Sequence, residues 1–329
     1  MRVVVVGATG NVGTALLRAL ADESAVDAVV GIARRAPAAA FPKTTFVRAD
    51  VSRDDLVPHF RGADCVVHLA WLIQPSRDRS TTWATNVLGS RRVFEATASA
   101  EVPALVYASS VGAYSPGPKD RTVDESWPTG GIRTSFYSRD KADVETLLDA
   151  FEREHPEVRV VRLRPSLIFQ RAMGTEVKKL FTGRWVPHRL FRADRIPLVP
   201  DTPRLRFQAT HSDDVADAYR RAALGEARGA FNVAADPVLD PDALARLFHA
   251  RKVAVPARLL RGLVAATWRA RIQPTPEGWV DMGLQTPLLD TSRARTQLGW
   301  QPRKSAGDAL LELVRGFHDG AGAPTPPLA

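Results

Sequence analysis

The chain opens with four consecutive valines that run directly into a glycine turn. Residues 1–13 read MRVVVVGATGNVG, and the residues that follow, TALLRAL, have a helical pattern. A strand, a tight turn and a helix N-terminus in direct succession suit a dinucleotide pyrophosphate, because glycines let the backbone approach the phosphates and the helix offers free N–H groups. The glycines are Gly7, Gly10 and Gly13, spaced G-x-x-G-x-x-G. This order of elements predicts a dinucleotide-binding fold.

Apolar runs then alternate with helical patterns. Strands are expected at 2–7, 25–33, 44–50, 64–70, 103–110, 158–166 and 230–234, and helices at 14–23, 53–60, 85–100, around 135–145 and at 212–224. Short Val-rich strands between helices indicate a parallel sheet covered on both faces. We predict a doubly wound α/β (Rossmann) fold for residues 1–165, with a return segment at about 207–233. Residues 166–206 and 234–318 would form a smaller, mostly helical substrate-binding lobe, and 319–329 a disordered tail.

Composition argues against several other classes of protein. With 329 residues, of which 45% are hydrophobic and 25% charged, the chain can bury a sizeable core. The formal charge is +9, but the arginines are scattered and no basic run alternates with aromatics, so we expect no nucleic-acid partner. We find neither a signal peptide nor a run of roughly 18 apolar residues, and therefore expect a cytoplasmic protein with no membrane partner. A lone Cys65 leaves neither a disulfide nor metal-ligand spacing, so no metal is expected.

Two arginines follow the second predicted strand. In this fold an acid about 20 residues after the glycine turn binds the ribose 2′-hydroxyl of NAD. The corresponding stretch, VVGIARRAP, has Ala33, Arg34 and Arg35 instead. An acid would repel a 2′-phosphate, whereas two guanidiniums offer it paired hydrogen bonds. NADP(H) is therefore favoured as the cofactor. NAD(H) is the alternative, and in that case both arginines would simply be solvated side chains at the end of the strand.

A tyrosine and a lysine stand one helical turn apart in SFYSRDKADVE. Tyr137 and Lys141 would share one face of a helix. Such a pair can be an ordinary helix surface, with the tyrosine packed at its edge. It can also be a phenol whose proton is controlled by a nearby cation, and other motifs must decide between the two.

Together the motifs resemble those of the extended short-chain dehydrogenase/reductases of the NAD(P)-dependent epimerase/dehydratase type, over nearly the whole chain. GATGNVG resembles the nucleotide turn of that family, Ala49-Asp50 its adenine-side acid, HLA at 68–70 its nicotinamide-side strand and NVLGSRR its Asn-bearing helix. YASSVGAY resembles its serine strand and YSRDK its Tyr-x-x-x-Lys helix, while HSDDVADA and LDTSRARTQLGWQP resemble landmarks of its substrate half.

The resemblance implies catalytic roles for Ser110, Tyr137, Lys141 and Asn86. Tyr137 would be the general acid or base. A free phenol titrates near 10, and we expect the positive charge of Lys141 to lower this pKa. By resemblance, Lys141 also bonds the nicotinamide ribose. Ser110, favoured over Ser109, would hydrogen-bond the substrate oxygen. Asn86 would lie behind Tyr137 and Lys141; the alternative is that it is a polar residue on the surface of its helix.

The remaining site residues are also implied by the resemblance. The expected cofactor contacts are Gly7, Thr9, Gly10, Asn11, Val12, Gly13, Arg34, Arg35, Asp50, Val51, Leu69, Ala70, Trp71, Tyr137, Lys141 and Pro165. The expected substrate pocket comprises Trp71, Ser110, Val111, Tyr137, Phe181 and Trp185. His68 and His211 match family landmarks, and we interpret both as structural histidines.

Departures from the family pattern narrow the chemistry. Sugar-nucleotide dehydratases carry Asp-Glu directly after the Ser/Thr, where this chain has Val111 and Gly112, so dehydration is disfavoured. Asp140 replaces a small residue before the lysine, and an ion pair there would weaken the effect of Lys141 on the phenol. No stretch matches a nucleoside-diphosphate clamp. Trp71, Leu72 and Ile73 follow the nicotinamide-side strand instead, and the predicted lobe contains Phe181, Trp185 and Phe191. Such a lining suits an apolar or aromatic carbonyl compound.

We therefore predict an NADP(H)-preferring oxidoreductase that acts on a carbonyl or secondary alcohol of a small molecule. An epimerase with a retained cofactor is the alternative, since it would use the same Ser, Tyr and Lys. A cofactor-sensing protein on the same fold is a third, and the intact Ser110, Tyr137 and Lys141 argue against it. The resemblance is also compatible with a homodimer.

Overall fold

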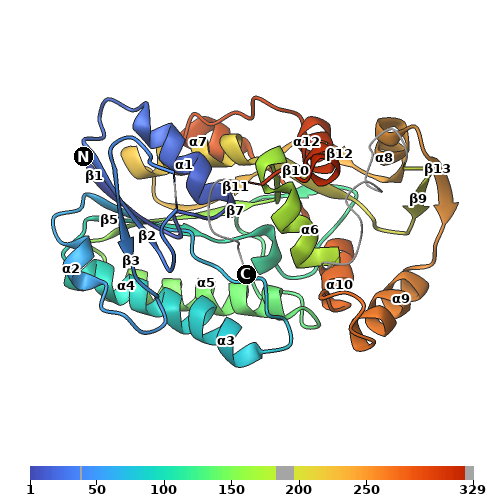
Figure 1. Cartoon of the computed structure of the whole chain (residues 1–329), viewed down its shortest axis with the longest axis horizontal. Coiled ribbons are helices and arrows are strands. Elements are labelled where there is room, and N and C mark those ends of the chain that lie inside the picture. Colours follow the sequence, from blue (N-terminus) through green and yellow to red (C-terminus); the bar gives the residue numbers. More distant parts are fainter. Residues whose placement is uncertain (38, 183–195, 323–329) are drawn as a thin grey trace.

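The fold is described by a computed structural model that covers residues 1–37, 39–182 and 196–322 (Figure 1). Its central strands are β1 (Arg2–Val6), β2 (Ala28–Ala33), β3 (Thr44–Arg48), β4 (Cys65–His68), β5 (Ala104–Ala108), β7 (Arg159–Pro165) and β11 (Gly229–Val233). They form one seven-stranded sheet in the order β11-β7-β5-β4-β1-β2-β3, and every neighbouring pair is parallel. The predicted doubly wound α/β fold is confirmed.

Helices cover both faces of this sheet (Figure 1). One face carries α1 (Asn11–Ala21) and α7 (Ser212–Leu224), and the other carries α4 (Gly89–Ser99) and α5 (Phe136–Glu154). Side chains of a strand alternate between the two layers. Val3 and Val5 accordingly pack beneath α1 and α7, whereas Val4 and Val6 pack against the opposite layer. Because both faces are buried, β1 is an unbroken run of valines.

The strand order places the glycine turn at a crevice. From β1 the chain proceeds outward to β2 and β3, and then returns to the other side of β1 to form β4 and β5. In parallel sheets, ligands bind where the strand order reverses, at the carboxyl ends of the strands. Here the reversal lies between β1 and β4, so the turn after β1 and the residues after β4 face the same crevice.

The second lobe combines helices with small sheets. Its strands are β8 (Leu167–Phe169), β10 (Phe207–His211) and β12 (Ala235–Leu239) in one sheet, β9 (Leu198–Asp201) with β13 (Arg251–Ala254), and β6 (Thr122–Val123) with β14 (Leu288–Leu289). Its helices include α6 (Gly174–Thr182), α8 (Pro241–Phe248), α9 (Ala257–Arg269), α10 (Gly278–Gln285), α11 (Ser292–Gln297) and α12 (Ala306–Asp319). Apart from those in the return segment, none of these strands is predicted from the sequence. Each is too short for an alternation of apolar and polar residues to be recognised.

The return segment and the C-terminal tail can be placed only in part. Within 207–233, α7 packs on α1 and β11 forms the edge of the main sheet beside β7. The tail expected at 319–329 lies outside the described residues from position 323 onward.

One predicted helix is shorter than expected. In place of a helix over 53–60, α2 spans only Val57–Phe60 and has Pro58 in its first turn. The preceding aspartates bond to the backbone, since Asp54 Oδ2 accepts from the Asp50 N–H at 2.8 Å and Asp55 Oδ1 from the Val57 N–H at 3.0 Å. Such local bonds compete with helix formation, so the segment forms turns first.

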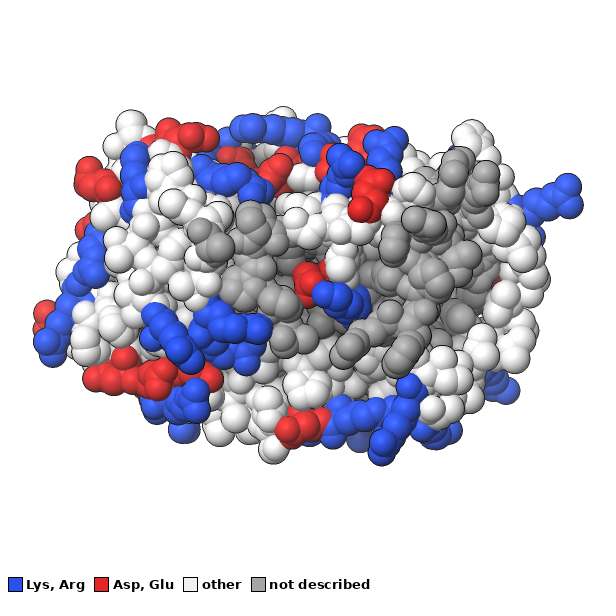
Figure 2. Space-filling model, viewed as in Figure 1, with Lys and Arg blue, Asp and Glu red and all other residues white. Residues whose placement is uncertain are grey.

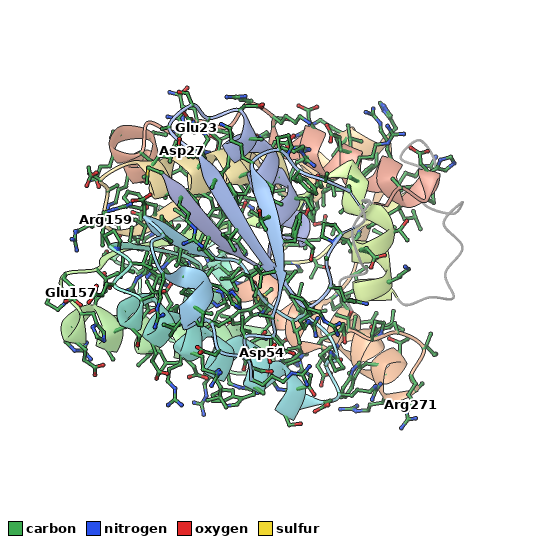
Figure 3. All side chains as sticks on the ribbon, turned by 60° about the vertical axis from the view of Figure 1, so that its left-hand side comes forward. Glu23, Asp27, Asp54, Glu157, Arg159 and Arg271 are labelled. Atoms are coloured by element: carbon green, nitrogen blue, oxygen red, sulfur yellow. The ribbon has the colours of Figure 1, made fainter. Side chains whose placement is uncertain are left out.

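Charges on the molecular surface are mixed in sign. Figure 2 shows basic and acidic side chains interspersed over the face displayed. At the amino-terminal edge of the sheet, the Met1 ammonium pairs with Asp27 at 2.7 Å, and Arg220 pairs with Glu23; both acids are labelled in Figure 3. This edge is opposite the crevice, so these pairs contribute to the fold and not to the site.

None of the helices within the described ranges is both long enough and apolar enough to cross a bilayer.

Candidate active site

The turn after β1 leaves no room for side chains. Gly7 has φ of +90°, and a Cβ there would lie 2.6 Å from the Ala70 nitrogen. A Cβ at Gly13 would lie 2.4 Å from the carbonyl oxygen of Gly7. Gly10 is the N-cap of α1 and makes no side-chain cap bond, which leaves first-turn N–H groups for a ligand. This cradle of backbone fits the pyrophosphate of a dinucleotide.

A cleft extends from this cradle in two directions along the carboxyl edge of the sheet. Toward β2 it is lined by Val6, Gly7, Thr9, Gly10, Ile32, Ala33, Arg34, Arg35, Ala49, Asp50, Val51, Leu69, Ala70, Trp71, Leu72 and Thr85. Toward α5 it is lined by Gly7, Gly10, Asn11, Val12, Gly13, Leu69, Trp71, Ile73, Ala108, Ser109, Ser110, Val111, Tyr137, Lys141, Pro165, Ser166, Leu167, Ile168, Phe169, Val177, Tyr219, Trp279 and Met282. Every residue expected to contact the cofactor lies in one of these two walls.

The expected substrate residues are placed less completely. Trp71, Ser110, Val111 and Tyr137 line the part of the cleft toward α5. Phe181 belongs to α6, but its side chain is not among those described, and Trp185 lies outside the described residues.

Arginines gather at the far end of the cleft, where β2 and β3 end. Arg34 and Arg35 line this end together with two residues that the sequence analysis did not select, Arg48 and Arg53. Arg48 is the last residue of β3, which pairs with β2 in parallel, so adjacent strand ends bring the side chains together. Arg34 was identified because it follows the end of a predicted strand. The same criterion, applied to the end of the next strand, would have identified Arg48.

Asp50 and Asp54 line the same end of the cleft, and both accept hydrogen bonds from neighbouring residues of the protein. Asp50 Oδ1 accepts from the N–H of Ser52 at 3.0 Å and from its hydroxyl at 2.7 Å. Burial raises the pKa of Asp50, but the Ser52 hydrogen bonds and the charges of Arg34 and Arg53 outweigh it, so the pKa is lowered overall. Asp54 accepts from the Asp50 backbone. The arginines therefore exceed the acids here and favour an anionic group.

Tyr137 lies in the first turn of α5 and is held between aromatic rings. Its ring centroid is 5.8 Å from that of Trp71 and 4.9 Å from that of Trp279. A Cβ on Gly112 would lie 2.9 Å from Tyr137 Cε1, so the backbone of the serine loop packs on the ring. The Ser138 hydroxyl donates to the Gly112 carbonyl and thereby ties this loop to α5. The phenol is therefore fixed before any ligand binds.

The two serines after β5 have different partners. Ser110 Oγ accepts from the Gly112 N–H at 3.0 Å, and it hydrogen-bonds with Tyr137. The hydroxyl of Ser109 instead donates to the buried carboxylate of Glu145. Strand alternation separates the neighbours in this way, and it leaves Ser110 beside the phenol.

Lys141 is enclosed by protein groups. Its ammonium donates to the Ala108 carbonyl at 2.6 Å, lies 3.4 Å from the Tyr107 hydroxyl, and is 3.4 Å from the centroid of the Trp71 ring, which is close enough for a cation–π contact. Burial lowers the pKa of Lys141 well below its usual value. The lysine thus lies one turn from Tyr137, but its ammonium is directed to the end of β5.

The expected lowering of the Tyr137 pKa is wrong in this structure. Burial raises the pKa of the phenol, and the hydrogen bond with Ser110 offsets only a part of that rise. A phenol with a pKa above its usual value near 10 is protonated at neutral pH. The site therefore holds an acid that is ready to donate a proton.

The carbonyl reduction that the sequence predicts should have a pH dependence that reflects this protonation state. Reduction needs the protonated phenol, so kcat/KM should stay level between about pH 7 and pH 9 and fall only above about pH 10, where Tyr137 loses its proton. Initial rates measured at saturating cofactor, over a pH series at constant ionic strength, test this. A fall centred near neutrality would show that the pKa is lowered after all.

Asn86 positions the loop after β4. It is fully buried in a π-helical turn at Ala84–Leu88, which excludes the surface alternative. Its amide accepts from the Leu72 N–H at 2.7 Å and donates to the Leu72 carbonyl at 2.9 Å. The described contacts of Asn86 thus fix the backbone next to Trp71, and the catalytic role expected for Asn86 stays a prediction.

Asp140 is paired away from the lysine. Its carboxylate accepts from Arg79 at 2.6 Å, and the Arg79 guanidinium stacks on the Phe136 ring at 4.4 Å. The buried acid next to Lys141 therefore has a cation of its own from α3 (Arg79–Trp83).

Both histidines have structural partners. His68 Nε2 lies 2.9 Å from the Ser90 hydroxyl, and burial lowers its pKa to about 3. His211 caps α7 by accepting from the Asp213 N–H at 3.1 Å.

Cys65 is buried in β4, and burial raises its pKa to about 12. Within the described part of the chain, no three His, Cys, Asp or Glu side chains gather as a metal site.

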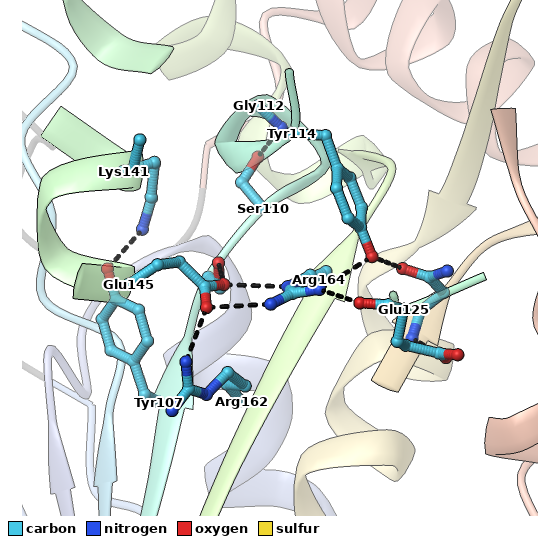
Figure 4. Close-up of polar contacts among 12 residues, drawn as sticks. Tyr107, Ser110, Gly112, Tyr114, Glu125, Lys141, Glu145, Arg162 and Arg164 are labelled. Atoms are coloured by element: carbon cyan, nitrogen blue, oxygen red, sulfur yellow. Dashed lines mark hydrogen bonds and ion pairs between the residues drawn. The ribbon is translucent and has the colours of Figure 1, made fainter. Parts of the chain in front are cut away.

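Figure 4 shows a buried ion network that anchors α5 beneath the site. Arg164 donates from Nε and Nη2 to the two carboxylate oxygens of Glu145, both at 2.9 Å, and Arg162 Nη1 donates to Oε2 at 2.9 Å. Burial raises the pKa of Glu145, but the hydrogen bonds and charges of the two arginines bring it down to about 2. The same Arg164 donates to the Tyr114 hydroxyl at 3.0 Å. The helix with Tyr137 and Lys141 is thus fastened to β7.

Three comparisons with known proteins place the chain in a family. The family model described as "NAD dependent epimerase/dehydratase family" matches residues 3–234. The chain is 26% identical to an uncharacterized protein of Mycobacterium tuberculosis (strain ATCC 25618 / H37Rv), covering 95% of this chain and 83% of the relative. It is 27% identical to UDP-glucose 4-epimerase of Mycolicibacterium smegmatis (strain ATCC 700084 / mc(2)155), covering 97% and 99%. The structure of the Thermus thermophilus UDP-glucose 4-epimerase complex with NAD superimposes with a TM-score of 0.69 at 21% identity, covering 96% and 99%.

The fold and cleft define a dinucleotide-binding α/β protein with a Ser, a Tyr and a Lys at one end of its ligand site. With the family model covering more than half of its length, the chain belongs to the NAD-dependent epimerase/dehydratase family. It is an NAD(P)-dependent enzyme of the extended short-chain dehydrogenase/reductase type.

Part of the wall beside Tyr137 was not predicted from the sequence. Trp279 and Met282 come from α10, far from the other site residues in the chain. Phe169 and Val177 come from the second lobe. None of these positions carries a local motif, so only the packed structure assigns them to the cleft.

Proposed function

We propose that the protein is an NADP(H)-preferring oxidoreductase that interconverts a small-molecule carbonyl compound and its secondary alcohol. The observation that supports this is a single cleft that joins an arginine-rich end to a protonated phenol. The arginines suit the 2′-phosphate of NADP(H). When bound, the nicotinamide would supply or accept the hydride of the reaction.

The residues of the chain have separate tasks in this proposal. Tyr137 donates a proton to the substrate oxygen during reduction and takes it back during oxidation. Ser110 hydrogen-bonds the same oxygen, where negative charge develops. The Gly112 N–H donates to Ser110 Oγ, so the serine hydroxyl proton remains available to donate. Lys141 would bond the nicotinamide ribose, and the ring of Trp71 would lie beside that ribose.

Cofactor titration tests the preference. The purified protein is denatured and any released nucleotide is identified by mass spectrometry; the stripped protein is then titrated with NADPH and NADH. We expect exchangeable NADPH that binds at least about tenfold more tightly than NADH, because one or more charge-assisted hydrogen bonds would form with its 2′-phosphate. A tightly retained stoichiometric NAD would contradict the proposal.

A double substitution, Arg34→Gln with Arg35→Gln, should weaken NADPH binding about 10- to 100-fold and leave the affinity for NADH within about threefold. The reason is that NADH lacks the 2′-phosphate, the group to which we expect these guanidiniums to bind. Arg91→Gln is a matched control, because Arg91 lies on α4 and pairs with Glu95 on the surface. Equal losses for both cofactors would indicate that these arginines do not select the phosphate.

An epimerase with a retained cofactor is the second candidate. It is favoured by the similarity to UDP-glucose 4-epimerase along 97% of the chain. Such an enzyme would interconvert UDP-sugars without net oxidation, so product analysis after incubation with UDP-galactose, without added cofactor, separates it from the reductase.

A further inference from the structure

We infer that the cleft selects an apolar, uncharged carbonyl compound with a planar ring next to the carbonyl, and not a nucleoside-diphosphate sugar. This inference rests on the proposed function, because it assigns the substrate class of the same site. It is carried by the side chains around Tyr137, most of which the family motifs do not include.

The walls beyond the expected cofactor contacts are apolar. Around Tyr137 they comprise Ile73, Val111, Phe169, Val177, Trp279 and Met282. Among the described residues that line this part of the cleft there is no arginine, aspartate or glutamate, and Lys141 is the one ammonium. That ammonium already contacts the Ala108 carbonyl and the Trp71 ring. A diphosphate needs several cations or N–H donors, and among the described residues of these walls only the Lys141 side chain is a cation.

Several other polar side chains of this part are occupied within the protein. Asn11 Oδ1 accepts from Gln170 at 2.7 Å and from Ser212 at 2.9 Å. Ser109 donates to Glu145, and the hydroxyl of Ser166 lies 2.8 Å from that of Thr210. Ser110 and Tyr137 remain for one carbonyl oxygen, and the buried indole N–H of Trp71, which has no hydrogen-bond partner among the described residues, adds one donor. A hexose has several further hydroxyls, and most of them would lose a hydrogen bond to water without gaining one from the described residues.

The two tryptophans beside Tyr137 favour a flat substrate. With centroid distances of 5.8 Å to Trp71 and 4.9 Å to Trp279, they present ring surfaces beside the phenol that must reach the carbonyl oxygen. Aromatic rings pack on one another in offset or edge-to-face contacts that add to the energy of apolar burial. A planar ring attached to the carbonyl would make such contacts while its oxygen reaches Tyr137 and Ser110.

The wall formed by α10 is fixed at both ends. At its start, a Cβ on Gly278 would lie 2.4 Å from the Thr134 carbonyl, just ahead of α5. At its end, Lys119 donates to the Gly283 carbonyl at 2.9 Å and Arg204 to the Leu284 carbonyl at 3.0 Å, where cations stabilise a helix terminus. Trp279 therefore lies in a preformed wall, which makes the shape of the pocket selective.

A substrate panel with NADPH tests the inference. Oxidation of NADPH is followed with acetophenone, with its anionic analogue 4-acetylbenzoate, with glyceraldehyde and with UDP-glucose, and binding is measured by quenching of tryptophan fluorescence. We expect kcat/KM for acetophenone to exceed that for the anion by about tenfold or more, because the described walls give a carboxylate no free cation. UDP and UDP-glucose should not bind.

Trp279→Ala should lower kcat/KM for acetophenone about 10-fold, mainly by raising KM, while the Kd for NADPH stays within about twofold. Trp83→Ala is the matched control, since Trp83 is exposed on α3 and does not line the cleft. An unchanged KM in Trp279→Ala would overturn the role of the aromatic wall.

The outcomes also separate this inference from the proposed function. Reduction of glyceraldehyde without reduction or binding of acetophenone would leave the reductase standing and overturn the apolar substrate. Tight binding of UDP with interconversion of UDP-sugars would overturn both. Failure of every aryl ketone to bind or react would overturn the inference regardless of the other substrates.

Discussion

Replacement of Tyr137 with phenylalanine is expected to lower kcat/KM for carbonyl reduction by about 10²- to 10⁴-fold, the usual contribution of a positioned general acid. The substitution removes only the hydroxyl that donates the proton, and the ring would keep its contacts with Trp71 and Trp279. The Kd for NADPH should therefore change by less than about threefold. Steady-state kinetics and a fluorescence titration measure the two quantities on the same preparation.

Tyr219→Phe provides the matched control. Tyr219 lies on α7 and lines the same cleft, but Ser110 is not among its described contacts. The control should retain turnover within a few-fold of the parent protein. If Tyr137→Phe also retained it, another group would have to be the acid, and the assignment would be lost.

Replacement of Glu145 with alanine is expected to destabilise the fold by about 3–5 kcal/mol, the usual cost of breaking a buried ion pair from one side. Glu145 is 1% exposed, and it is the acceptor for Arg162, Arg164 and the Ser109 hydroxyl. Its removal would leave the guanidinium of Arg164 buried without its carboxylate. Urea unfolding followed by circular dichroism measures the loss.

Glu154→Gln is the control for the second substitution, because Glu154 is an exposed acid of the same helix. Its free energy of unfolding should stay within about 0.5 kcal/mol of the parent value. A Glu145 variant that is as stable as this control would show that the network contributes little to the fold.

The contribution of the same network to the free energy of unfolding depends on pH. The pKa of Glu145 is held at about 2 in the folded protein, below the value near 4.3 of an unfolded chain. Its contribution to stability is therefore complete above the unfolded pKa and is lost as the pH falls through the folded one. Between about pH 4 and pH 2 the parent should lose more stability than Glu145→Gln, in which this titration is absent.

The network also connects stability with catalysis. Glu145 lies one helical turn beyond Lys141 and two turns beyond Tyr137 on α5, and Ser109, its hydrogen-bond donor, adjoins Ser110. One buried carboxylate thereby holds both the helix of the phenol and the strand end of the serine. This arrangement explains why the two serines of the family motif have different roles.

The sequence by itself determined the elements whose residues are close together in the chain. The Val-rich strand and the three glycines specify the cradle, because φ of +90° at Gly7 and the close approach at Gly13 exclude side chains locally. The one-turn spacing of Tyr137 and Lys141 follows from helix geometry in the same way. Arg34 was found because it directly follows a recognisable strand.

The tertiary structure alone decided the environment of these groups. Lys141 is directed to the Ala108 carbonyl, and burial raises the pKa of Tyr137; both depend on neighbours that pack from other elements. Trp279, from α10, completes the wall beside the phenol. A local pattern encodes backbone conformation, whereas burial and electrostatic surroundings arise only when distant segments meet. This is why Tyr137 could be proposed as the acid from the sequence, whereas the direction of its pKa shift could not be predicted.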